Sequence, residues 1–268
     1  MARWPLALAL VLLAGCGSSS PGPGPSPLPS RITVQGTITE TLTGAPVGTF
    51  TQTVDRLPAF ITVQADGFLQ RQLTVTSATP TVDLIRDAPP FDLAFYRQFA
   101  RGELEGPLQP LRVLSQAPGI YLQTAGLSPA NVAALEQAAR TVVPALTGGR
   151  FSVTVFETGA EARAPRAGWI TVEVINSSEP CGSANVGAAA GSVRMNTAGR
   201  CAFGGHAIYP PSFAHELGHA LGFSHVAEAG HLMKSDGPYS RNDPSPTERH
   251  HAAIAYARTA GNRDPDID

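Results

Sequence analysis

Alternating apolar and polar positions dominate the stretch from residue 31 to residue 87. Examples are Ile32-Thr33-Val34-Gln35 and Gln72-Leu73-Thr74-Val75, and the turn-forming Thr43-Gly44-Ala45-Pro46 lies between them. Alternation with a period of two is typical of half-buried strands, and Gly and Pro mark the turns that separate strands. The pattern therefore predicts a small antiparallel β-sandwich over residues 31–87.

Helical periodicity begins after this stretch. Phe91, Phe95 and Phe99 recur at a spacing of four, which predicts a short helix whose aromatic stripe packs as core between two domains. This helix lies in a connector over residues 88–110. Ser128-Pro129 is typical of a helix start, with Ser as the N-cap and Pro in the first turn, so we expect a long helix from there.

Extended runs alternate with helical ones in the remainder of the chain. The expected strands cover residues 111–114 with 119–123, 151–157, 169–174 and 193–195. Ser245 and Glu248 have the spacing of a capping box, which predicts a final helix. The pattern predicts an α+β fold, in which a second domain over residues 111–268 follows the β-sandwich.

The N-terminal residues have the composition of a targeting segment. Arg3 precedes an apolar run from Leu6 to Leu13, which is too short to span a bilayer. The following Cys16 completes Leu13-Ala14-Gly15-Cys16, which resembles the lipobox of bacterial lipoproteins, in which the Cys is lipidated. An ordinary secretory signal with an unrelated Cys is the alternative.

The lipobox resemblance implies a signal peptide over residues 1–16, followed by a Pro/Gly/Ser linker over residues 17–30. The protein would then be extracytoplasmic and lipid-anchored to a bacterial membrane. In a host with two membranes, Gly17 after the Cys implies the outer membrane or the cell surface.

Charge and cysteine content narrow the partners further. The formal net charge is −2 and no basic stripe is present, which argues against nucleic acid. With Cys16 lipidated, Cys181 and Cys201 remain. An even pair outside the cytoplasm predicts a disulfide, and two separate buried thiols are the alternative.

The run from His215 to His225 carries the residues for metal chemistry. His215 and His219 are four residues apart, so on a helix both imidazoles leave one face and can reach one ion. Gly222 can end the helix with a positive φ, which lets His225 return as the third ligand. Three imidazoles leave the fourth position of a tetrahedral zinc ion to water, and Glu216 is placed to be the general base towards that zinc-activated water.

The string His-Glu-x-x-His-x-x-Gly-x-x-His resembles that of the metzincin zinc metallopeptidases. The resemblance implies a catalytic domain with a twisted mixed sheet, a long helix, the zinc-binding helix and a C-terminal helix. It also implies a Met-turn at Met233, whose side chain forms an apolar floor beneath the ligands. The short gap from His225 to Met233 is similar to that of the matrixin branch.

Two further expectations depend on the same resemblance. Some metzincins have a Tyr two residues after the Met that supports the oxyanion, and Ser235 stands there in this chain. Tyr239 or Tyr209 is then the candidate substitute, with a packing role as the alternative. An edge strand that pairs with substrate backbone is expected between the two cysteines, where the small residues Gly187 to Gly191 suit it.

These features predict a zinc-dependent endopeptidase that hydrolyses peptide bonds of extracytoplasmic proteins, with one catalytic Zn²⁺; bound calcium is left open. A surface-anchored binding or adhesion protein with a non-catalytic zinc site is one alternative. A zinc hydrolase of a non-protein amide in the cell wall is another. Four other histidines fit no ligand pattern, and the adjacent pair among them is expected to be solvated: His206, His231, His250 and His251.

Overall fold

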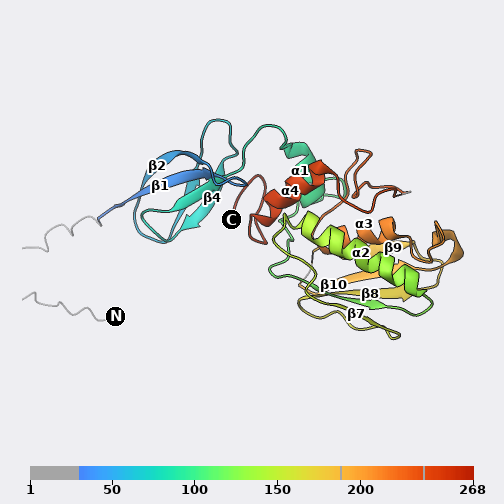
Figure 1. Cartoon of the computed structure of the whole chain (residues 1–268). Helices are drawn as coiled ribbons and strands as arrows, with labels where there is room; N and C mark the ends of the chain where they lie inside the picture. Colours follow the sequence, from blue (N-terminus) through green and yellow to red (C-terminus); the bar gives the residue numbers. More distant parts are fainter. Residues whose placement is uncertain (1–29, 188, 238) are drawn as a thin grey trace, which may run out of the picture.

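The computed structural model describes residues 30–187, 189–237 and 239–268, which form a mixed α/β structure. Two small sheets are followed by a five-stranded sheet with helices, as Figure 1 shows. In this part of the chain no helix has the length and apolar character needed to cross a membrane. Cys16, the predicted signal peptide and almost all of the predicted linker lie outside the described residues.

The N-terminal sheets are built from short strands and enclose one hydrophobic cluster. One sheet has the order β2 (Pro46–Val54), β1 (Ile32–Glu40), β5 (Thr81–Leu84), and the other pairs β3 (Ala59–Val63) with β4 (Arg71–Val75). Alternate side chains from both sheets fill the space between them: Val34, Ile38, Ile61, Val63, Val75, Val82 and Leu84. The pairing of β1 with β5 is parallel, so the expectation of a purely antiparallel arrangement is wrong. The β3–β4 hairpin supplies the crossover that a parallel pair requires.

The five-stranded sheet has the order β7 (Phe156–Gly159), β6 (Gly119–Gln123), β8 (Trp169–Ile175), β10 (Gly191–Asn196), β9 (Gly182–Ala184). Neighbouring strands are parallel, except that the edge strand β9 runs antiparallel to β10.

Two of the expected strands differ from those observed. Residues 111–114 form no strand, because Leu111 pairs with the C-terminal segment: its N–H donates to Asn262 and its carbonyl accepts from Gly261. The strand expected over residues 151–157 begins only at Phe156.

Four α-helices complete the fold of the described residues. α2 (Pro129–Leu146) begins where the sequence predicts, with the Ser128 hydroxyl accepting from the Asn131 N–H at 3.2 Å, and it packs against α3 (Pro210–Ala220). α1 (Leu93–Arg101) packs against α4 (Pro246–Tyr256). The three phenylalanines of the predicted stripe are buried, as predicted, although Phe91 lies before the first residue of α1. A 3₁₀ turn, Gly199–Cys201, precedes α3.

His251 corrects the expectation that both adjacent histidines are solvated, since it is fully buried between α1 and α4. Its Nε2 accepts from the Asp92 N–H at 2.9 Å, and its Nδ1 lies 2.8 Å from the Thr247 carbonyl. The ring also stacks on Phe91, with 5.3 Å between the ring centroids. Burial lowers the pKa of His251, so this histidine is a neutral core residue.

The C-terminal residues return to the N-terminal sheets. Gln72 of β4 donates its N–H to Asp266 and accepts from the Asp268 N–H, each at 2.9 Å, and Figure 1 shows the C-terminus beside β4. Arg258 and Asp266 are fully buried and form a bidentate pair at 2.7 and 2.8 Å, and Arg258 also contacts Asp83 at the end of β5. We call residues 258–268 the C-terminal clamp, because they join the two parts of the molecule.

Candidate metal centre

The three histidines of the motif converge on one point. The Nε2 atom of His215 lies 3.1 Å from that of His219 and 3.3 Å from that of His225, and the third side of this triangle is 3.2 Å. In a tetrahedral zinc site with Zn–N bonds of about 2.0–2.1 Å, ligand nitrogens lie about 3.3–3.4 Å apart. The cluster therefore fits one zinc ion.

Backbone carbonyls orient two of these imidazoles. Nδ1 of His215 lies 2.7 Å from the Leu232 carbonyl, and Nδ1 of His219 lies 2.8 Å from the Phe223 carbonyl. A carbonyl only accepts hydrogen bonds, so Nδ1 carries the proton and the lone pair of Nε2 faces the common centre. Burial lowers the pKa of His215 to about 3 and that of His219 to about 4, so both are neutral at physiological pH.

Gly222 makes the third position possible. Its φ is +107°, a left-handed conformation that L side chains rarely adopt, and a Cβ there would lie 2.7 Å from the Arg112 carbonyl oxygen. The chain reverses at this point and carries His225 back towards α3. The Oε1 atom of Glu105, in the loop after α1, lies 2.7 Å from Nδ1 of His225.

Glu216 and the three histidines line one cleft, which has a volume of about 410 Å³. Glu216 is buried, and burial raises its pKa to about 8. The edge strand β9 passes directly over it, because a Cβ on Gly182 would lie 2.5 Å from the Glu216 Oε1 atom. An edge strand thus lies between the two cysteines, as expected, but at Gly182–Ala184 rather than at Gly187–Gly191, since Gly191 begins the interior strand β10.

The loop that contains Met233 is held from α4. The N–H groups of Leu232 and Met233 donate to the Glu248 carboxylate at 3.0 and 2.8 Å, and Glu248 also completes the predicted capping box with Ser245. Met233 is fully buried, and its sulfur occupies the space that a side chain on Gly218 would need. The carbonyl of Leu232 also orients His215. Glu248 therefore links the capping box of α4 to the metal centre through Leu232, a connection that the sequence does not reveal.

The expected tyrosines occupy different places. The ring of Tyr239 stacks on His215, with centroids 4.1 Å apart, and lines the cleft with Ser235. Burial, together with the Glu216 carboxylate, raises the pKa of Tyr239 to about 12. Tyr209 precedes α3 and packs against Phe203 instead.

The remaining residues singled out by the sequence lie outside the ligand cluster. Cys181, immediately before β9, forms a disulfide with Cys201 at the end of the 3₁₀ turn. His231 contacts the Ser245 hydroxyl at 2.8 Å, and His206 lies 3.4 Å from the Asn131 side chain. Neither belongs to the ligand cluster, in agreement with the sequence pattern.

No protein-family model matches the sequence, and a search of curated proteins gives no match. Solved structures with some likeness include high choriolytic enzyme 1, a hatching enzyme zinc-protease from the medaka Oryzias latipes, at 14% identity and a TM-score of 0.34, covering 54% of this chain and 94% of that one. Metalloproteinase-II from Bacteroides fragilis has the same identity and TM-score and covers 85% of this chain and 92% of its own.

Proposed function

We propose that this chain is a zinc-dependent endopeptidase, in which His215, His219 and His225 hold the metal and Glu216 is the general base. The observation that carries the proposal is the triangle of three Nε2 atoms with a buried carboxylate in the same cleft. When bound, zinc would activate a water molecule and polarise the carbonyl of the scissile bond.

Glu216 supplies the proton transfers. Its carboxylate accepts a proton from the attacking water and delivers it to the amine that leaves when the C–N bond breaks. The pKa of about 8 belongs to the buried carboxyl without a neighbouring cation. A divalent cation beside it favours the charged carboxylate, which is the form that accepts a proton.

The edge strand β9 supports a peptide as the substrate. It pairs with β10 on one side, and its residues Gly182, Ser183 and Ala184 line the cleft on the other. An extended peptide can add to such an edge through main-chain hydrogen bonds, and small side chains leave room for it. Tyr239 is the candidate donor to the oxyanion, since it lines the same cleft beside His215.

The proposal extends to the family. The motif and its spacing suggest a metzincin of the matrixin-like branch, with Met233 in the Met-turn. Lipid attachment at Cys16 and an extracytoplasmic location belong to the same proposal, and the Cys181–Cys201 disulfide supports it because disulfides persist outside the cytoplasm.

The test compares the wild-type chain without residues 1–16 with its Glu216→Ala variant on a broad peptide library. We expect cleavage by the wild type, and a loss of about 10²–10⁴-fold in the variant, the range typical of a general base. Zinc content and thermal unfolding are measured in parallel. Wild-type protein with one bound zinc that cleaves no peptide would contradict the proposal.

That contrary result would favour one of the two alternatives. Cleavage of cell-wall fragments that depends on Glu216 would indicate a hydrolase of a non-protein amide. Ligand capture unaffected by Glu216→Ala would indicate a binding protein with a non-catalytic zinc site.

A further inference from the structure

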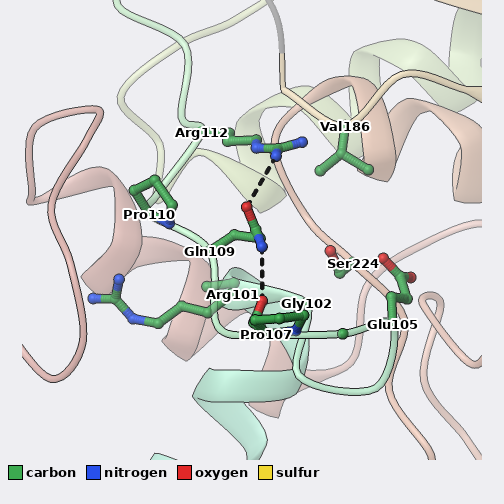
Figure 2. Close-up of a pocket in the computed structure, with 12 residues that line it drawn as sticks. Arg101, Gly102, Glu105, Pro107, Gln109, Pro110, Arg112, Val186 and Ser224 are labelled. Atoms are coloured by element: carbon green, nitrogen blue, oxygen red, sulfur yellow. Dashed lines mark hydrogen bonds between the residues drawn. The ribbon is translucent and has the colours of Figure 1, made fainter.

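One wall of the metal cleft comes from outside the segment that carries the motif. Glu105 lies in the loop between α1 and the first residues of the predicted catalytic domain. Figure 2 shows it beside Ser224, at a second cavity of about 280 Å³ that shares Glu105 and Val186 with the metal cleft.

α1 fixes the segment that carries His225. The rings of Phe99 and Phe223 are stacked, with centroids 4.2 Å apart and planes at 10°. The Ser224 N–H donates to the Phe99 carbonyl at 2.7 Å, and the Ala227 N–H donates to the Gln98 side chain at 3.0 Å. The helix therefore holds both the loop with Glu105 and the segment with His225 in one register.

Glu105 makes two contacts with His225, both through Oε1. This oxygen lies 2.7 Å from the imidazole Nδ1 and accepts from the backbone N–H at 3.2 Å. His215 and His219 place Nδ1 against neutral backbone carbonyls instead. A carboxylate beside Nδ1 holds the proton on that nitrogen, directs Nε2 to the metal and increases the basicity of the ligand.

We infer that Glu105 is the positioning residue for His225 and strengthens zinc binding through the charge of its carboxylate. The inference rests on the proposed zinc site and adds a residue from the connector to it. His225 is also the most exposed of the three ligands and reaches its place only through the turn at Gly222. A partner from outside the motif segment, such as Glu105, therefore contributes most to positioning this ligand.

The experiment measures zinc affinity by competition with a chelator in the wild type, Glu105→Gln, Glu105→Ala and the matched control Glu103→Gln. Glu103 is an exposed carboxylate of the same loop. We expect the apparent zinc dissociation constant to rise by about 10–100-fold in Glu105→Ala, the usual effect of removing such a partner. The dissociation constant should also rise in Glu105→Gln, because this variant keeps an acceptor oxygen and loses the charge. Glu103→Gln should bind zinc like the wild type.

Metal-free thermal unfolding separates positioning from folding, since the inference expects all four proteins to unfold alike without zinc. If Glu105→Gln binds zinc like the wild type and only Glu105→Ala is weakened, Glu105 merely accepts from a backbone N–H and the inference fails. Wild-type affinity in both variants overturns it as well. If the wild type binds zinc and cleaves nothing, the proposed function fails, while the affinity ratios still decide the role of Glu105.

Discussion

The metal centre and the C-terminal clamp both consist of buried polar side chains. Those of the metal centre are close together along the chain, whereas those of the clamp are far apart. The three histidines and Glu216 lie within one run of eleven residues, and two of the histidines are oriented by carbonyls a short way downstream. The clamp instead pairs Arg258 with Asp83, and Arg71 with Asp268, over separations of 175 and 197 residues.

The two regions therefore have different tasks, metal binding in one and structural attachment in the other. Burial lowers the pKa of His215 and His219, so these two imidazoles are neutral and can receive a cation. The clamp groups neutralise one another, so they add no chemistry and instead fix the N-terminal sheets against the second part of the molecule. The N-terminal sheets are consequently attached at two points, through the segment that leads to α1 and through the C-terminal residues. Four predictions test this division, starting with the largest effect.

Removal of zinc should abolish activity and leave the clamp intact. With a chelator, peptide hydrolysis falls to background and returns when zinc is added. Zinc at about 1,000 times its dissociation constant should stabilise the fold by about 4 kcal/mol through mass action alone. Calorimetry with and without zinc measures this difference, and circular dichroism should show retained helix content. Unfolding of the N-terminal sheets on zinc removal would contradict the separation of the two regions.

Breaking the clamp should have the opposite effect. Asp266→Ala leaves the fully buried Arg258 without its bidentate partner, which typically costs about 3–5 kcal/mol. Urea unfolding measures the loss, and zinc affinity of the folded variant should not change. Asp55→Ala is the matched control, because it removes an aspartate from the exposed pair with Arg31, where about 0–1 kcal/mol is expected. Equal losses in the two variants would show that the clamp contributes no more than a surface pair.

The disulfide is expected to affect the metal cleft rather than the clamp, because Cys181 directly precedes the edge strand that lines this cleft. Replacing both Cys181 and Cys201 by Ser should lower stability by about 3 kcal/mol, as expected for a loop of this length. The Michaelis constant for peptides should rise more than the turnover number falls, since β9 is loosened while the zinc ligands stay in place. A fall in turnover number with an unchanged Michaelis constant would assign the disulfide to the ligands rather than to β9.

Local sequence patterns were enough to predict the metal centre, but they could not predict the clamp. Spacing of four on a helix is enough to bring His215 and His219 together, and the capping box of α4 follows from Ser245 and Glu248 alone. The contacts of Glu105 with His225, and of Glu248 with the loop at Met233, depend on how separate elements pack. Nothing in the residues around Asp83 or Asp266 marks them as partners of Arg258, because the fold alone brings these segments together.

Contacts between distant segments also account for wrong predictions at single elements. Residues 111–114 alternate like a strand, yet Leu111 pairs with the C-terminal segment rather than with the sheet. His251 has the sequence context of a solvated residue, and the packing of α1 on α4 buries it. In both cases a distant segment decides the environment of a residue whose local pattern is ambiguous.

Acid pH should weaken the clamp in a defined window, which is the smallest of the four effects. Burial raises the pKa of Asp83, but the charges of Arg258 and Arg71 and the hydrogen bonds to this carboxylate outweigh burial, so its pKa is lowered in the folded state. A depressed carboxyl pKa adds stability that is fully present above the unfolded value of about 3.9 and is lost as pH falls through the folded value. The difference in unfolding free energy between the wild type and Asp83→Asn should therefore be constant from about pH 5 upwards and shrink below about pH 4. Urea unfolding at a series of pH values measures it, with Asp55→Asn as the control for a surface carboxylate. A difference that grows as pH falls would mean that Asp83 is protonated in the fold, and the ion pairs of Arg258 and Arg71 would then be those with Asp266 and Asp268.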